Sequence, residues 1–154
     1  MSIVSKAFAK ARRSSAPRAG GRLLRRVPRV RYAPLSDGRP DPGEVVWAWV
    51  PYEEDASQGK DRPVLLLASD RTHVYGLMLT SQDHDRDAAD EARWGRHWMD
   101  VGSGGWDRER RPSEVRLDRL LRLDPAHVRR EGAALDRPVF DAVVARARRF
   151  HRLG

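Results

Sequence analysis

The fold is decided by two stretches of sequence, KDRPVLLL at residues 60–67 and LMLTSQ at residues 77–82. The first ends in a continuous aliphatic run, which is typical of a central strand covered on both faces. Residues 73–80 form the next strand candidate, and the short turn between the two strands predicts an antiparallel hairpin. In such a hairpin Arg62, at the start of one strand, lies beside Thr80, at the end of its partner.

Strand signals recur on both sides of this hairpin. Residues 44–50 form a strand candidate rich in Val and Trp, and residues 97–101 and 113–117 form two more, separated by a Gly-rich turn. Residues 83–93 are charged and permissive for a helix. About five short strands with a terminal helix predict a small, strongly bent barrel of the α+β class.

Two helices are predicted near the C-terminus. Asp124 followed by Pro125 is typical of a helix start, and Gly132 would end this short helix. Asp136 would cap a second helix, with Pro138 in its first turn. We expect its apolar stripe to cover the barrel; the stripe consists of Val139, Phe140, Val143, Val144, Ala147 and Phe150.

The net charge of +8 is unevenly distributed over the 154 residues. Residues 1–31 hold ten Lys and Arg residues and no acid, whereas the other 20 basic residues are outnumbered by 22 acids. We interpret residues 1–40 as a basic, largely disordered arm and residues 41–154 as the folded domain. Such an arm favours nucleic acid or another polyanion, and a solvated tail without a partner is the alternative. The candidate contacts in the arm are Arg12, Arg13, Arg22, Arg25 and Arg26.

Composition excludes several classes of protein. No cysteine is present, so disulfides and thiolate metal sites are excluded. The longest apolar runs are too short to cross a bilayer, and the N-terminus lacks the apolar core of a secretory signal. We therefore expect a cytoplasmic protein with no membrane partner. The acid-free start with its Arg and Ser residues leaves a mitochondrial presequence open as an alternative.

The order of these motifs resembles the MazF/PemK family of bacterial toxin endoribonucleases. The resemblance extends over roughly residues 42–150, judged by the order and spacing of the strand signals. The stretches that carry it are PGEVVW at residues 42–47, Gly59, RPVL at residues 62–65, TSQ at residues 80–82 and SEV at residues 113–115.

The resemblance implies an SH3-like barrel, a homodimer, and sequence-selective cleavage of single-stranded RNA without a metal or other cofactor. The products would be a 2′,3′-cyclic phosphate and a 5′-hydroxyl, and a cognate antitoxin would occupy the RNA groove. The family's catalytic arginine falls on Arg62 and its catalytic threonine on Thr80. The acidic loop at residues 83–87 and the basic arm depart from the better-known toxins.

The residue types at these two positions suit the chemistry. RNA carries its own nucleophile, the 2′-hydroxyl, so an enzyme must orient it, move protons and stabilise a phosphorane. Arg62 can donate two hydrogen bonds to the non-bridging oxygens, and Thr80 adds an uncharged donor. The alternatives are an ion pair between Arg62 and Asp61 or an acid of residues 51–60, and ordinary strand-end hydroxyls at Thr80 and Ser81.

Further residues are candidates for supporting roles in binding and catalysis. His84 is the candidate general base, because the neighbouring acids Asp83 and Asp85 would make its imidazole more basic. A metal site at His84 is the alternative, but the cluster lacks fixed ligand spacing. Gln82 would contact a base or close the turn, and Lys60 and Ser81 would support Arg62 and Thr80.

The five tryptophans are many for this length. Trp94 and Trp106 lie in predicted loops and are the better candidates to stack on unpaired bases. Trp47, Trp49 and Trp98 lie in predicted strands, so we expect them to be buried in the barrel or in a dimer interface.

A second function stays open at this stage. A non-catalytic module with the same barrel could bind RNA or the ribosome through its basic arm, with no reaction at Arg62.

Overall fold

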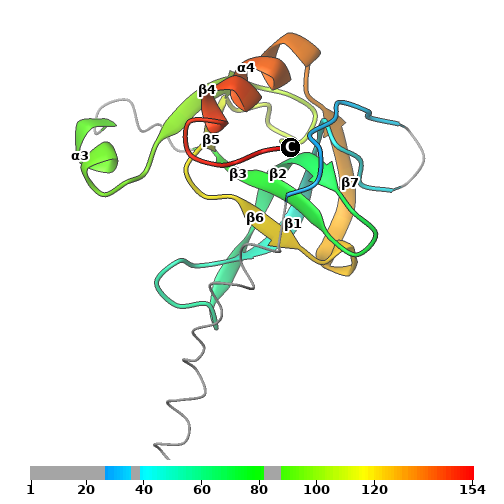
Figure 1. The fold of residues 1–154 in the computed structure, drawn as a ribbon, viewed down its shortest axis with the longest axis horizontal. Coiled ribbons are helices and arrows are strands. Elements are labelled where there is room, and N and C mark those ends of the chain that lie inside the picture. The colour runs from blue at the N-terminus through cyan, green and yellow to red at the C-terminus, as the bar shows by residue number, and fades with distance from the viewer. Residues whose placement is uncertain (1–26, 36–38, 82–87) are drawn as a thin grey trace, which may run out of the picture.

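The computed structural model describes residues 27–35, 39–81 and 88–154 (Figure 1). Within these residues the chain forms a strongly bent, mainly antiparallel sheet with two helices, which confirms the predicted α+β class. The strands follow the order β4-β5-β3-β2-β1-β7, and β6 pairs with β3. Their bounds are β1 (Glu44–Pro51), β2 (Gly59–Ser69), β3 (Val74–Thr80), β4 (Trp98–Gly102), β5 (Ser113–Arg116), β6 (Leu121–Leu123) and β7 (Val128–Ala134). The helices are α3 (Ala88–Arg93) and α4 (Arg137–Ala147), with a 3-10 turn at Pro125–His127.

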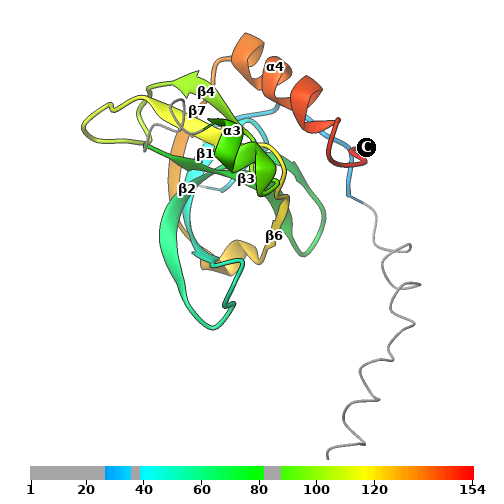
Figure 2. The same ribbon diagram turned by 90° about the vertical axis from the view of Figure 1, so that its left-hand side faces the viewer.

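β2 is buried on both faces, as its aliphatic run predicts. Leu65 and Leu67 pack into a core that α4 covers, whereas Val64 and Leu66 pack into a second core on the opposite face. Figure 2 shows the strands curving around this second core, with α4 outside the curve. The two faces of β2 therefore have different surroundings, and each β2 side chain is assigned to a face by strand alternation.

The bend of the barrel arises along β3. The first part of this strand pairs with β2, and its last two residues, Leu79 and Thr80, pair with β5. Gly76 lies at a close approach of β3 to β2, because a Cβ at this position would stand 2.4 Å from the carbonyl oxygen of Leu65. β3 thus joins the two halves of the sheet and ends at the junction.

The first predicted C-terminal helix is wrong. Asp124 does cap a turn, since its carboxylate accepts a hydrogen bond from the Ala126 N–H, but the turn is a single 3-10 segment. The chain then continues as β7, antiparallel to β1. Gly132 is a strand residue of β7. Only a glycine fits there, because a Cβ would lie 1.4 Å from the Val45 carbonyl oxygen on β1. Close approach of two strands, rather than the end of a helix, explains this glycine.

The second predicted helix, α4, is confirmed. Asp136 occupies the N-cap position, although its side chain makes no capping hydrogen bond. Phe140, Val143, Val144 and Ala147 are buried against the barrel, and Phe150, beyond the helix, is 39% exposed.

Residues 27–35 lie on the barrel, although the sequence analysis assigns them to the basic arm. We call this segment the strap. The Val30 N–H donates to the Gly154 carbonyl (3.1 Å), the Arg31 N–H donates to the Leu67 carbonyl (3.1 Å), and the Tyr32 hydroxyl donates to the Leu135 carbonyl (2.7 Å). The apolar pattern of residues 27–35 is too short to predict a strand. The position of the strap depends instead on hydrogen bonds with residues distant in sequence, such as Leu67 and Leu135.

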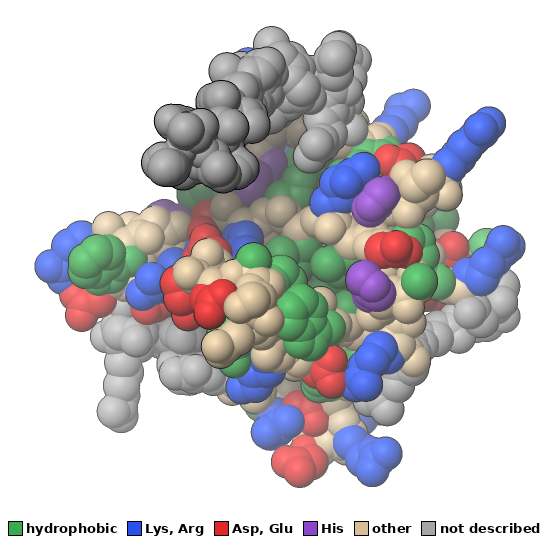
Figure 3. Space-filling view, turned by 90° about the horizontal axis from the view of Figure 1, so that it is seen from below, with side chains coloured by type: hydrophobic (Ala, Val, Ile, Leu, Met, Phe, Trp, Pro, Cys, Tyr) green, Lys and Arg blue, Asp and Glu red, His purple; other side chains and the backbone are tan. Residues whose placement is uncertain are grey.

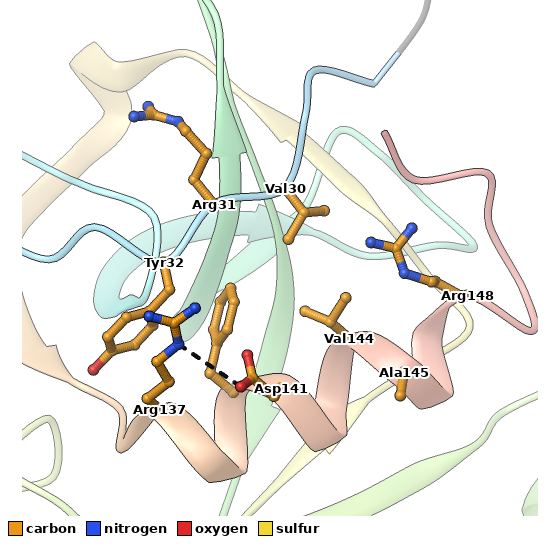
Figure 4. A pocket seen from close by; sticks show the side chains of 9 residues that line it. Val30, Arg31, Tyr32, Arg137, Asp141, Val144, Ala145 and Arg148 are labelled. Atoms are coloured by element: carbon orange, nitrogen blue, oxygen red, sulfur yellow. Dashed lines mark ion pairs between the residues drawn. The ribbon is translucent and has the colours of Figure 1, made fainter.

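The strap and α4 enclose a groove of about 240 Å³ (Figure 4). Val30 points toward Val144 across the groove, and the Tyr32 ring lies 5.1 Å from that of Phe140. Arg137 pairs with Asp141 at its rim (3.7 Å). The strap therefore extends the core on the α4 side of the sheet.

In the described residues no helix is long and apolar enough to span a membrane.

Candidate active site

Arg62 and Thr80 belong to the same face of the sheet, Arg62 as the fourth residue of β2 and Thr80 as the last residue of β3. Arg62 pairs with Ala48 across the β1–β2 ladder, and Ala48 is in the core opposite α4. The β2–β3 ladder ends at the pair Val64 and Met78, which belong to the same core. Arg62 precedes Val64 by two residues and Thr80 follows Met78 by two, so strand alternation directs both side chains to that face.

Arg62 is half-buried and has no carboxylate partner among the described residues. The alternative of an ion pair with a nearby acid finds no support in that part of the chain. Asp61 pairs instead with Arg129, and Glu53 pairs with Arg116. A partly desolvated guanidinium without a counter-ion favours the binding of an anion.

Charged residues of β5 share this face. Thr80 is the ladder partner of Glu114, and Trp98 is the ladder partner of Arg116. Glu114 and Arg116 are both buried. The apolar residues between and after them, Val115 and Leu117, point to the other core. β5 thus brings one acid, Glu114, and one cation, Arg116, to the same edge as Thr80.

Arg116 is 6% exposed and is held by two carboxylates. It contacts Asp118 at 2.8 Å and Glu53 at 3.0 Å. Burial opposes the charged form of Arg116, but the hydrogen bonds that it donates to Asp118 and Glu53 outweigh burial and raise its pKa. Burial likewise opposes ionisation of Asp118, yet the hydrogen bonds from Arg116 and the His97 N–H lower its pKa. This charge is therefore neutralised within the protein.

Arg119 is a further cation near Arg62. It is half-buried and donates a hydrogen bond to the Pro51 carbonyl at the end of β1 (2.7 Å). Burial lowers its pKa; the negative charge of Glu53 opposes this shift, and the like charges of Arg116 and Arg62 add to it. Three arginines thus act on one another at this end of the barrel. Figure 3 shows the end from which the β1–β2 hairpin projects, with Lys and Arg side chains interspersed with acids around apolar ones.

Comparison with protein families identifies the chain. Residues 41–151 match the model of the family described as PemK-like, MazF-like toxins of type II toxin-antitoxin systems. The chain belongs to this family. A search of curated proteins found no match. Because a type II system pairs its toxin with an antitoxin protein, membership implies a cognate antitoxin as a partner of this PemK-like chain.

The other predicted site residues of this PemK-like chain are placed as follows. Lys60 is exposed on the face of Arg62, opposite Val50, and Ser81 is exposed directly after β3. Trp94 follows α3 and is 75% exposed, so its ring is accessible to a base. Seven predicted contacts lie outside the described residues, namely Gln82, His84, Arg12, Arg13, Arg22, Arg25 and Arg26.

Trp106 corrects the sequence prediction. Although it lies in a loop, it is 3% exposed within the α4-side core, and its indole N–H donates to the Ser113 hydroxyl (3.1 Å). Gly104 packs against its ring, where an added Cβ would stand 2.2 Å away. The predicted stacking of Trp106 on a base is wrong, because no face of the ring is open.

The strand tryptophans are not fully buried within the single chain, and their predicted burial in a dimer interface stays a prediction. Trp49 is 41% exposed and covers Gly59, while Trp47 and Trp98 are half-buried. The Trp47 indole donates to the Trp106 carbonyl (2.8 Å), and the Trp98 indole donates to Glu91 (3.0 Å).

A cavity of about 390 Å³ opens beside β5, between α3, β4 and α4. Its polar lining includes Glu91, Arg96, Asp100, Glu114 and Arg146. Among the residues described, no three His, Asp or Glu side chains are close enough to hold a metal ion together.

Sequence reasoning on this toxin-family chain missed Glu114, Arg116 and Asp118. The signal was present, because charged residues alternate with Val115 and Leu117, which places the charges on one strand face. Arg119 and Glu53 gave no such signal, since the contacts of Arg119 with Pro51 and of Glu53 with Arg116 join segments that meet only in the folded chain.

Proposed function

We propose that this protein is an endoribonuclease toxin that cleaves single-stranded RNA without a metal ion. In the reaction the 2′-oxygen bonds to phosphorus while the bond from phosphorus to the 5′-oxygen breaks. The 2′-hydroxyl proton passes to a base, for which His84 is the candidate, and the 5′-oxygen gains a proton as it leaves. The products are a 2′,3′-cyclic phosphate and a 5′-hydroxyl.

Arg62 and Thr80 carry the main catalytic roles in this proposal. The Arg62 guanidinium donates two hydrogen bonds to the non-bridging oxygens, which gain charge as the phosphorane forms. The Thr80 hydroxyl donates a further hydrogen bond to the same group. Lys60 and Ser81 lie next to them and would bind the adjoining backbone.

One observation carries the proposal. Arg62 is a half-buried cation with no carboxylate partner in the described residues, and strand alternation directs it to the face of Thr80. An arginine with a merely structural role would be expected to have such a partner at this burial. Membership of the toxin family supports the same assignment.

The proposal includes three interactions of the whole protein. A cognate antitoxin would block the RNA-binding face, the toxin would act as a homodimer, and the basic arm would raise affinity for RNA or ribosomes.

The test is cleavage of a long RNA in the presence of a chelator, with the new ends mapped chemically. We expect 2′,3′-cyclic phosphate ends from the wild type, and a loss of about 100-fold to 1,000-fold in kcat for Arg62→Ala, the usual cost of one stabilising donor. Thr80→Val, which keeps the shape of the side chain, should also lose activity. Arg71→Ala, at the exposed far end of the β2–β3 hairpin, is the matched control and should cleave normally.

The outcome of this experiment also decides the second candidate. A wild-type protein that binds the RNA tightly and leaves it intact would show a non-catalytic binding module. The uneven charge of the sequence, with ten cations in residues 1–31, favours that function over a protein with no nucleic-acid partner.

A further inference from the structure

We propose that Arg119 is a second phosphate-binding residue, which acts together with Arg62 on the scissile phosphodiester. The inference rests on the ribonuclease function proposed above and adds a residue that the motif comparison does not indicate. It follows from the way in which the segment after β5 meets the β1–β2 hairpin.

Two contacts fix the segment that carries Arg119. Arg116 binds Glu53 in the loop after β1 (3.0 Å), and Arg119 donates to the Pro51 carbonyl (2.7 Å). These contacts hold residues 116–119 against the end of the β1–β2 hairpin, three ladder pairs from Arg62, whose positive charge acts on Arg119. The Arg119 guanidinium is therefore positioned by the backbone of β1 rather than by an acid.

The charges around Arg119 leave it available to an anion. Among the described residues Arg116 has two carboxylate partners, whereas neither Arg62 nor Arg119 has an ion pair. Glu53 and Glu54 act on Arg119 from a greater distance, and the positive charges of Arg62 and Arg116 oppose them. Two neighbouring guanidiniums without a bound carboxylate make a site for a phosphate.

Arg119 keeps enough hydrogen-bond donors for this role. A guanidinium has five N–H donors, and the Pro51 carbonyl takes one from Nη2. The remaining donors can bind a non-bridging oxygen while Arg62 binds the other. Because the phosphodiester gains one negative charge on reaching the phosphorane, a second fixed cation stabilises the transition state more than the ground state.

A structural role is the competing explanation. Arg119 could serve only to tie the loop after β1 to the barrel through Pro51. Glutamine separates the two roles, because its amide can donate to a carbonyl but has no charge. Lysine keeps the charge and loses the planar fork.

The experiment compares wild type, Arg119→Gln and Arg119→Lys in steady-state cleavage of one RNA oligonucleotide. Arg71→Gln, which removes an exposed charge at the far end of the β2–β3 hairpin, is the matched control. We expect Arg119→Gln to lower kcat by about 100-fold with little change in KM, as for a donor used in the transition state. Arg119→Lys should recover part of kcat, and Arg71→Gln should match the wild type. Urea unfolding should give the same midpoint for all four proteins.

Three results would overturn the inference alone. They are normal cleavage by Arg119→Gln, a rise in KM without a fall in kcat, and a loss of activity that parallels a lower urea midpoint. Binding of the same oligonucleotide with a 2′-deoxy residue at the cleaved position separates this failure from that of the function. A wild type that binds this analogue but cuts no RNA would overturn the ribonuclease proposal, and the catalytic role of Arg119 with it.

Discussion

Single residues at the candidate site differ in how their charges are balanced. Arg116 is nearly buried and is neutralised by Glu53 and Asp118, whereas Arg62 is half-buried and has no such partner within the described chain. Burial makes an unpaired charge costly, so a paired arginine and an unpaired one side by side have different roles. Arg116 is neutralised within the protein, whereas Arg62 is available for the anion-binding role proposed above.

The Arg116–Asp118 pair gives a prediction for stability. Asp118→Ala should destabilise the protein by about 3 kcal/mol, because removal of one partner leaves a buried charge only partly compensated. Chemical denaturation at neutral pH measures the difference.

The double variant Arg116→Met, Asp118→Leu is the control for that prediction. It removes both charges and should recover much of the lost stability, since well-packed apolar residues often replace a buried pair without cost. A double variant as unstable as Asp118→Ala would contradict this account.

At the scale of the element, the turn between β2 and β3 depends on one carboxylate. Asp70 accepts hydrogen bonds from the N–H groups of Thr72 (2.9 Å) and His73 (2.8 Å) and from the Tyr75 hydroxyl (3.0 Å). The backbone hydrogen bonds from Thr72 and then His73 lower the pKa of Asp70 from 3.8 to about 2. The hairpin that positions Arg62 and Thr80 is therefore held by an ionised group at its far end.

The sign of the pH dependence follows from this lowered pKa. A carboxylate with a lower pKa in the folded state stabilises the protein fully above its ordinary pKa, and the contribution is lost as the pH falls toward the folded value. Asp70→Ala should cost about 0.5–1 kcal/mol at neutral pH, since Asp70 is exposed and screened. The difference in stability between Asp70→Ala and wild type, measured by thermal unfolding, should become smaller as the pH falls from 5 to about 2. An equal difference at both pH values would contradict the assignment.

The elements that could be predicted from sequence are those with a local signal. The β2–β3 hairpin follows from an aliphatic run, a short turn and alternation, and α4 follows from its capping residues and stripe. β7 could not be predicted, because its residues VRREGAA have no strand pattern and are extended only through pairing with β1. Gly132 then gave the wrong signal, since a glycine required by close strands looks the same in sequence as one that ends a helix.

The candidate site was predictable to the same extent. Arg62 and Thr80 lie in the hairpin whose register the sequence indicates. Trp106 could not be placed, because its burial depends on contacts with Ser113 and Trp47 that join separate loops and strands. The approach of Arg119 to Pro51 is non-local in the same way, across 68 positions of the chain.

At the scale of the whole molecule, the strap divides the basic N-terminal region into two parts. Residues 27–35 pack on the barrel, and residues 1–26 hold eight of the ten cations found in residues 1–31. The described contacts with the barrel come from the strap, and most of the positive charge lies before it in sequence.

Two truncations test this division. Removal of residues 1–26 should leave the thermal unfolding temperature unchanged and weaken RNA binding. The slope of log K against the logarithm of salt concentration should become shallower by about 0.7 for each phosphate contact that is lost. Removal of residues 1–35 should also lower the unfolding temperature, because Val30 and Tyr32 leave the core. An unchanged salt dependence after the first truncation would contradict a role of the arm in RNA binding.

Under the proposed ribonuclease function, the course of the strap also sets a requirement on the RNA. It lies on the α4 side of the sheet, with its Arg31 N–H bonded to Leu67, while Arg62 belongs to the opposite face. A transcript that is bound by the basic N-terminal region while it is cut beside Thr80 would have to wrap over an edge of the barrel. Short oligonucleotides would then have too small a footprint to benefit from residues 1–26, and only long transcripts would be captured more efficiently by the full-length toxin.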